Sequence, residues 1–406
     1  MSADPQASAL PEPHAQPAAE TTVVPVILAV SAGHFLNDLM QSLIPAVYPM
    51  IKDNLALSFA QIGVITLVFQ GTASILQPLV GLYTDRRPLP WALTAGMAST
   101  GAGLVALAHA GSFAVVLLAV ALIGLGSAVF HPESSRIARL ASGMRPGFAQ
   151  SVFQVGGNAG SAVGPLAAAF VVLDRGQVSI EWFAVVALVG MALLWSVGRW
   201  YVAVGAGRAV ARKARARATG SLPPGQVRLA MALLILLMFS KFVWSVSFSS
   251  YYTFYLIERF GLSVGASQIG LFVFLAAVAV GTYAGGPIGD RIGRRRVILW
   301  SILGILPLSL AVPWLPLAGA VVASGLAGMV LASAFPAMVV YAQDLMPQHT
   351  GMVAGLLFGL AFGLAAIGAA VLGVVADALG IEAVFRICSV LPALGLVAVL
   401  LPDPRG

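Results

Sequence analysis

Long apolar segments recur along the chain and are separated by short polar connections. A transmembrane helix needs about 20 mostly apolar residues. Backbone groups in lipid must be hydrogen-bonded internally, which leaves helices or closed barrels, and the segments lack the short alternation of barrel strands. The pattern predicts an all-α membrane protein with twelve transmembrane helices, at about 24–51, 60–83, 90–109, 113–138, 147–172, 181–201, 228–256, 265–288, 296–314, 317–342, 350–376 and 381–401.

Composition supports lipid-facing surfaces. The 406 residues are 59% hydrophobic and only 9% charged, whereas soluble domains carry about 25% charged residues. The net charge of +7 is compatible with nucleic-acid binding or with the positive-inside bias of membrane proteins. The basic residues lie in short loops between apolar segments, which favours the membrane interpretation and predicts no nucleic-acid partner.

The distribution of Lys and Arg predicts the orientation. With the N-terminus inside, the outer side receives only Lys52, Arg175, Arg259 and Arg386, while Lys241 falls within a span. We therefore expect both termini to be cytoplasmic, in a bacterial inner membrane. The expected domains are a disordered cytoplasmic tail (1–22), a six-helix bundle (23–201), a basic cytoplasmic linker (202–227) and a second six-helix bundle (228–402).

The two halves repeat each other. Asp85 and Asp290 follow the second span of their halves, about 205 residues apart, and Phe130 and Phe335 lie in the fourth spans at the same separation. The paired motifs Gln61-Ile62-Gly63 and Gln268-Ile269-Gly270, and the paired glycines Gly147 and Gly351, keep nearly this register. The repeat indicates a tandem duplication with a substrate site between the halves, as in many transporters.

The segment from Gly286 to Arg295 resembles the signature loop of the major facilitator superfamily, Gly-x-x-x-Asp-Arg-x-Gly-Arg-Arg. The copy from Gly81 to Arg87 departs from it because Pro88-Leu89-Pro90 replaces the last part, so we expect an asymmetric gate. Each Asp can accept hydrogen bonds from a neighbouring helix N-terminus, and each Arg can pair across helix ends. The alternative is a positively charged turn that only sets topology. The expected gating residues are Asp85, Arg86, Arg136, Asp290, Arg291 and Arg294.

The fifth span carries Gly160-x-x-x-Gly164-Pro165, which resembles the antiporter motif of exporters in this superfamily. Small residues let helices approach closely and Pro165 bends the helix, so ordinary packing is the alternative explanation. The first half also resembles the fosmidomycin resistance subgroup, through residues 33–38, 130–136 and 150–158 with Gln70 and Gln77-Pro78. That resemblance implies proton-driven drug export.

Polar side chains within the spans mark the candidate site. A charge at the bilayer centre costs about 2.5–3.5 kcal/mol, so it usually faces a cavity and has a function. Asp38 and Lys241 lie near the middle of spans 1 and 7, and a pairing between them follows as a hypothesis, with a structural salt bridge as the alternative. Tyr255 we assign to an outer aromatic belt. The expected proton-coupling residues are Asp38, Glu133 and His131, and the expected substrate-binding residues are His34, Asn37, Asp38, Gln41, His131, Gln154, Asn158, Lys241, Trp244 and Tyr251.

The sequence predicts a proton-coupled secondary transporter, most simply an antiporter that exports a small anionic or zwitterionic compound by alternating access. Uptake of a small polar metabolite by proton symport is the alternative. An intramembrane enzyme or a sensor is disfavoured because neither a catalytic set nor a sizeable soluble domain is recognisable. We expect no cofactor and no metal. The expected partners are a small-molecule substrate, protons and the lipid bilayer, and the expected functional unit is a monomer.

Overall fold

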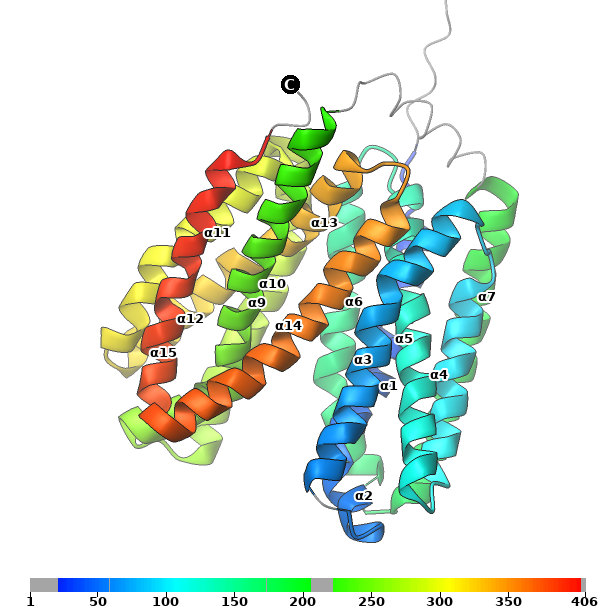
Figure 1. Cartoon of the computed structure of the whole chain (residues 1–406), viewed down its shortest axis with the longest axis horizontal. Coiled ribbons are helices and arrows are strands. Elements are labelled where there is room, and N and C mark those ends of the chain that lie inside the picture. The colour runs from blue at the N-terminus through cyan, green and yellow to red at the C-terminus, as the bar shows by residue number, and fades with distance from the viewer. Residues whose placement is uncertain (1–20, 58, 173, 206–221, 403–406) are drawn as a thin grey trace, which may run out of the picture.

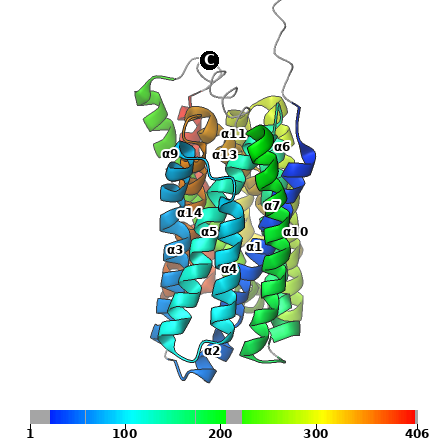
Figure 2. The same cartoon turned by 90° about the vertical axis from the view of Figure 1, so that its right-hand side faces the viewer.

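The first half of the chain forms a bundle of six membrane-length helical segments. The computed structural model describes residues 21–57, 59–172, 174–205 and 222–402. Its first bundle contains α1 (Val24–Ala46), the short α2 (Tyr48–Asn54), α3 (Phe59–Arg86), α4 (Ala92–Ala108), α5 (Phe113–Ala141), α6 (Pro146–Ala167) with η1 (Ala168–Val172), and α7 (Phe183–Trp200) between η2 (Gln177–Trp182) and η3 (Tyr201–Gly205). Figure 2 shows this bundle facing the viewer.

The second half repeats the arrangement. It contains α9 (Pro224–Phe260), α10 (Val264–Ile292), α11 (Arg294–Ala311) with η4 (Val312–Trp314), α12 (Leu317–Ala332), α13 (Ala334–Leu345), α14 (Thr350–Leu379), and α15 (Ile381–Val390) with η5 (Leu391–Leu400). The two bundles lie side by side (Figure 1). The expected twelve-span, two-bundle architecture is therefore observed, although α9 begins at Pro224, inside the segment expected to be linker.

The helices form where apolar segments are long enough to satisfy their own backbone in lipid. In the described part of the chain, nine helical segments are long and apolar enough to cross a membrane, and α4 is apolar but shorter. The remaining two spans, α1 and α6, carry the polar stripes of the first half. Large apolar side chains such as Leu67, Phe170 and Trp300 are mostly exposed, as expected of surfaces that face lipid rather than water.

Two predicted spans are interrupted. The span expected at 24–51 divides at Val47 into α1 and α2, with Pro45 and Pro49 on either side of the break. The span expected at 317–342 divides at Ser333 into α12 and α13, shortly before Pro336. Proline removes a backbone donor and crowds the preceding turn, so it favours breaks at these points.

Glycines let the two bundles make backbone contact. α3 packs on α14, and α6 packs on α10. A Cβ atom at Gly81 would overlap the backbone of Gly351, and one at Gly286 would overlap that of Gly147. These two close approaches occupy equivalent places in the repeat. The bundles approach each other at the end where α14 begins and diverge towards the other end (Figure 1).

The beginning and end of the described chain lie at this same face. The hydroxyl of Thr22 donates to the carbonyl of Ser142 at 2.9 Å, just beyond the end of α5. The hydroxyl of Tyr341, in the last turns of α13, donates to the carbonyl of Pro402 at 2.6 Å. Because Arg139 of α5 and Asp344 of α13 pair across the halves, both chain ends lie at the face where the bundles are closed.

Candidate transport site and gate

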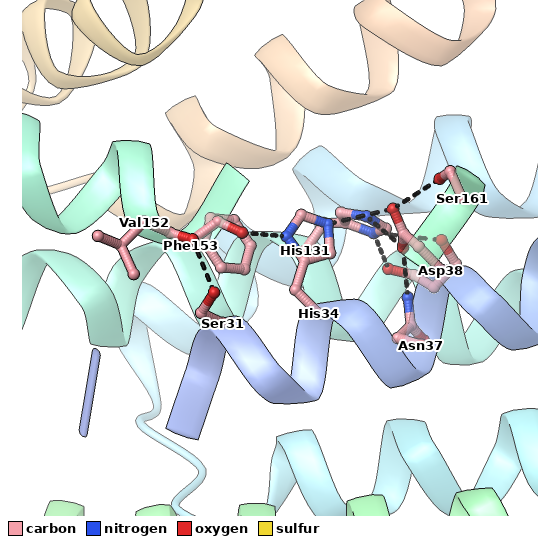
Figure 3. Close-up of polar contacts among 9 residues, drawn as sticks. Ser31, His34, Asn37, Asp38, His131, Val152, Phe153 and Ser161 are labelled. Atoms are coloured by element: carbon pink, nitrogen blue, oxygen red, sulfur yellow. Dashed lines mark hydrogen bonds and ion pairs between the residues drawn. The ribbon is translucent and has the colours of Figure 1, made fainter. Parts of the chain in front are cut away.

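Asp38 is the centre of a buried polar cluster in the first bundle (Figure 3). One carboxylate oxygen lies 3.3 Å from Nε2 of His34, and the other lies 3.4 Å from Nε2 of His131. Asn37 donates to the carboxylate at 3.0 Å, and Ser161 donates at 3.5 Å. Residues from α1, α5 and α6 thus meet at one carboxyl group.

The orientation of each histidine ring is fixed by a backbone carbonyl. Nδ1 of His34 lies 2.8 Å from the carbonyl oxygen of Phe153, and Nδ1 of His131 lies 3.0 Å from that of Ser127. A carbonyl oxygen only accepts hydrogen bonds, so in each of these contacts Nδ1 carries the proton and donates; the hydroxyl of Ser127 also lies 3.2 Å from Nδ1 of His131. In the neutral state of each ring, Nε2 then presents a lone pair to Asp38.

This arrangement requires at least one exchangeable proton. Without one, two lone pairs and an ionised carboxylate would face one another at hydrogen-bonding distance. A proton on either Nε2 or on the carboxyl group converts one contact into a hydrogen bond, and a second proton does the same for the other. The cluster formed by His34, Asp38 and His131, hereafter the Asp38 cluster, therefore places three side chains that can carry a proton in contact with one another.

The Asp38 cluster also has ligand types that metals use. Its candidate ligand atoms lie within 4.8 Å of one another. A closed structural zinc site takes four ligands, and the described residues supply three.

Glu133, expected to take part in proton coupling, is held by Arg136 instead. The guanidinium donates to both carboxylate oxygens, at 3.0 and 2.5 Å, and its third nitrogen donates to the hydroxyl of Tyr201 at 3.1 Å. Bidentate pairs of this kind are strong and geometrically specific. Because Arg136 binds both Glu133 on α5 and Tyr201 on η3, this pair is suited to holding α5 and η3 together.

The hypothesised pairing of Asp38 with Lys241 is wrong for this structure. The carboxylate is occupied by partners from its own half. The Lys241 ammonium lies over the rings of Phe242 and Phe335, at 4.3 and 5.4 Å from their centroids. Among the described residues, no carboxylate lies within ion-pair distance of it. Lys241 is only 8% exposed, so it is a buried cation stabilised by aromatic faces.

The other expected substrate-binding residues divide into two groups. Gln41 and Gln154 each keep a buried polar atom without a hydrogen-bond partner among the described residues, and Asn158 donates across the halves to Thr282 at 3.4 Å. Trp244 and Tyr251 instead serve packing, because the Trp244 indole donates to Ser309 and the Tyr251 hydroxyl donates to the carbonyl of Ala369.

Tyr255, expected in an outer aromatic belt, is fully buried. Its ring packs on Phe385, with centroids 4.2 Å apart. This tyrosine therefore belongs to the core of the second bundle rather than to its lipid-facing rim.

Asp85 and Asp290 each bind the N-terminus of a helix in the opposite half. The Asp85 carboxylate accepts from the backbone N–H groups of Gly351 and Met352, at 3.0 and 2.9 Å. The Asp290 carboxylate accepts from those of Gly147 and Phe148, both at 2.9 Å. Free N–H groups and the helix dipole favour an anion at such a position.

The arginine contacts differ between the two copies of the signature loop, 81–87 and 286–295. The departure from the motif at 88–90 predicted such an asymmetry. Arg294 lies 3.6 Å from Asp290 and 2.8 Å from Asp344. Asp85 has no arginine within ion-pair distance in the described residues. Arg86 and Arg291, both expected to gate, have exposed side chains and are not brought into these contacts.

Sequence reasoning missed the pair formed by Arg139 and Asp344 across the halves. The two residues are 205 positions apart, which is the separation of Asp85 and Asp290. They are therefore equivalent positions in the two halves, occupied by opposite charges. Comparing charges at this offset would have found the pair.

The small residues of α6 pack against α1. A Cβ atom at Gly160 would overlap the carbonyl group of Phe35, and one at Gly164 would overlap the hydroxyl of Ser42. The side chain of Pro165 lies outside the described residues. The close approach brings α6 to the helix that carries Asp38, so packing and site geometry depend on the same glycines.

Two six-helix bundles, a buried polar cluster inside the first bundle and mirrored contacts that close one face together have the architecture of a membrane transporter. The profile of the Major Facilitator Superfamily matches residues 30–367. The chain belongs to the major facilitator superfamily, a family of transporters of small molecules rather than of enzymes.

Full-length relatives support this assignment. The chain is 51% identical over 399 residues to the fosmidomycin resistance protein of Escherichia coli (strain K12), covering 97% of this chain and 98% of that one. It is 41% identical over 386 residues to the uncharacterized MFS-type transporter YfnC of Bacillus subtilis (strain 168), covering 95% and 94% of the two chains.

Solved structures show the same fold at low identity. The fucose transporter FucP of E. coli, in an outward conformation, aligns with a TM-score of 0.72 and 16% identity over 94% of this chain and 99% of that one. The human organic anion transporter MFSD10 aligns with a TM-score of 0.70 and 19% identity, over 95% and 100% of the chains.

Proposed function

We propose that this protein is a drug/proton antiporter that exports a small anionic or zwitterionic compound of the fosmidomycin type by alternating access. The substrate class rests on the 51% identity with the fosmidomycin resistance protein over nearly the full length of both chains. The observation that carries the proton coupling is the Asp38 carboxylate between two imidazoles whose Nδ1 atoms are already committed to backbone carbonyls.

The second element of the proposal is an anion site at Lys241. A buried ammonium without a carboxylate partner in the described residues is an expensive charge. An anionic substrate would compensate it, while the nearby aromatic rings would contact apolar parts of the same molecule. If the two sites are coupled, proton binding in the first half changes the affinity of Lys241 for substrate. Substrate binding then changes the proton affinity by the same factor, as linkage requires.

The closed face is proposed to be cytoplasmic, in the bacterial inner membrane, with both termini on that side. The support is the gathering of Arg86, Arg87, Arg145, Arg291 and Arg296 at helix ends on this face, which the positive-inside bias associates with the cytoplasm. In this arrangement Asp85, Asp290 and Arg294 help to close the cytoplasmic side, while Arg136, also expected to gate, holds α5 and η3 together next to it. The functional unit is proposed to be a monomer because one chain supplies both halves.

Growth inhibition tests the function directly. A susceptible bacterial host with and without the protein is exposed to a panel of inhibitors that includes small phosphonates, among them fosmidomycin. Expression should raise the inhibitory concentration for anionic phosphonates and leave bulky cationic drugs unaffected. Flux into everted vesicles under an imposed pH gradient then gives the direction. Uptake of the substrate into right-side-out vesicles together with protons would instead indicate symport and would contradict export.

A further inference from the structure

Three layers of side chains separate the Asp38 cluster from the closed face. Along α5, Arg139, Ser135 and His131 follow one another at four-residue intervals, which corresponds to about 6 Å of depth per step. The outermost layer is ionic and joins Arg139, Asp344 and Arg294. The middle layer is polar, and the innermost layer, against His131, is aromatic.

The polar layer is poorly suited to blocking protons. Gln343 donates to the hydroxyl of Ser135 at 3.2 Å, and this hydroxyl donates to Gln150 at 3.0 Å. Within the described residues, the amide oxygen of Gln343 and the amide nitrogen of Gln150 are buried without a hydrogen-bond partner. Such atoms bind water readily, and a hydrated row of hydroxyl and amide groups can pass protons.

The aromatic layer is the first dry layer next to the Asp38 cluster. The ring of Phe358 lies 5.4 Å from the ring of His131, 6.0 Å from that of Phe153 and 5.4 Å from that of Phe335. Phe362 meets the His131 ring edge-on at 5.1 Å. Phe358 is 2% exposed and His131 is fully buried, whereas Asp38 retains 9% exposure.

We propose that Phe358, assisted by Phe362, is the proton seal of the transporter. Both rings belong to α14 of the second half, but they cover a histidine of the first half. They exclude water from His131 only while the two halves are closed at this face. Separation of the halves removes the rings and opens the Asp38 cluster to that side, so access of protons is tied to the conformational cycle without any movement within the cluster itself.

This inference rests on the proposed proton coupling, and a leak assay tests it separately. The purified full-length protein is reconstituted in liposomes that contain a pH-sensitive dye, and a potassium diffusion potential drives protons inward in the absence of substrate. Phe358→Ala should raise the proton leak roughly tenfold, which corresponds to about 1.4 kcal/mol of barrier, because water can then reach His131. Phe358→Leu, which keeps apolar bulk, should remain tight.

Two further variants keep the result interpretable. Phe274→Ala removes an equally buried ring that packs on Trp244 and Phe248, away from the Asp38 cluster, and should not leak. Adding Asp38→Asn to Phe358→Ala should abolish the leak, because the protons pass through the cluster.

A Phe358→Ala protein that stays tight while it still exports overturns the seal and leaves the antiport intact. An equal leak in Phe274→Ala, or a leak that persists with Asp38→Asn, also overturns the seal. A wild-type protein that exports without moving protons instead refutes the proposed coupling, whatever Phe358→Ala does.

Discussion

The role of a buried carboxylate in this protein depends on the atoms that contact it. Asp38 and Glu133 are both buried carboxylates, but Glu133 is neutralised by a bidentate guanidinium while Asp38 faces two imidazoles. The first environment fixes the carboxylate in a bidentate pair. The second places the carboxylate among side chains that can carry a proton, which is what the proposed coupling needs.

Asp38→Asn should abolish export driven by a pH gradient and retain substrate binding. The amide keeps the size and a hydrogen-bond acceptor of the carboxyl group, but it cannot bind or release the transported proton. Flux in everted vesicles measures the first property and equilibrium binding to purified protein measures the second. Accumulation that still follows the pH gradient would show that Asp38 does not couple. His109→Ala, an exposed histidine outside the cluster, serves as the control.

Lys241→Ala should weaken binding of an anionic substrate roughly 10- to 100-fold, which corresponds to about 1.4–2.8 kcal/mol. The ammonium is the buried cation that the substrate would compensate, and alanine removes it. Lys241→Arg keeps the charge and should retain part of the affinity. Isothermal titration with a small phosphonate measures both variants. Unchanged affinity in the alanine variant would exclude Lys241 from the anion site.

At the scale of helices, the closed face is held by contacts that repeat about the symmetry of the two halves. Asp85 binds the start of α14, and Asp290 binds the start of α6. The ion pair between Arg139 and Asp344 adds one contact between equivalent positions. These contacts join the two halves at the closed face, so their loss should destabilise this arrangement and slow its formation rather than change the affinity of a site deeper in the bundle.

Asp290→Asn should slow turnover several-fold and leave substrate affinity nearly unchanged. The neutral amide loses the favourable interaction with the start of α6, which is worth about 0.3–1 kcal/mol or more for a charged group. Initial rates at saturating substrate and equilibrium binding distinguish the two effects. Asp377→Asn, an exposed carboxylate towards the other end of α14, is the control. Lost affinity with normal turnover would contradict a gating role.

Exchange of the charges at Arg139 and Asp344 tests their contact. Arg139→Asp alone places two carboxylates against each other and should impair export strongly. Arg139→Asp combined with Asp344→Arg restores opposite charges at these two positions but places the new cation beside Arg294, which pairs with Asp344, so export should recover in part relative to the single variant, as expected for directly coupled residues. A double variant as impaired as the single one would mean that the pair has no role in closing.

At the scale of the whole molecule, the proposed orientation, with both termini in the cytoplasm, can be tested by labelling. A cysteine at position 213, which lies outside the described residues, should be shielded from an impermeant maleimide applied to intact cells. Asp174→Cys, in the loop between η1 and η2 at the opposite face, should be labelled. The native Cys388 is buried and gives little background. Labelling of position 213 from outside would reverse the topology.

The sequence by itself determined the number of spans, the two-half architecture and the presence of Asp38, His131 and Lys241 within the membrane. These features follow from local composition. Lipid requires long apolar helices, and a charge inside a span is costly unless it faces a cavity or a partner. The kind of donor that binds Asp85 and Asp290 could also be anticipated, since the free N–H groups at a helix N-terminus attract an anion.

Only the tertiary structure decided which polar groups meet. The pairing of Asp38 with His34 and His131, rather than with Lys241, depends on the rotation of each helix and on the carbonyl groups of Phe153 and Ser127. The cover that Phe358 forms over His131 joins residues far apart in the chain. Apolar residues are present on every span, so no pattern along the sequence distinguishes a ring that faces lipid from one that seals a proton site.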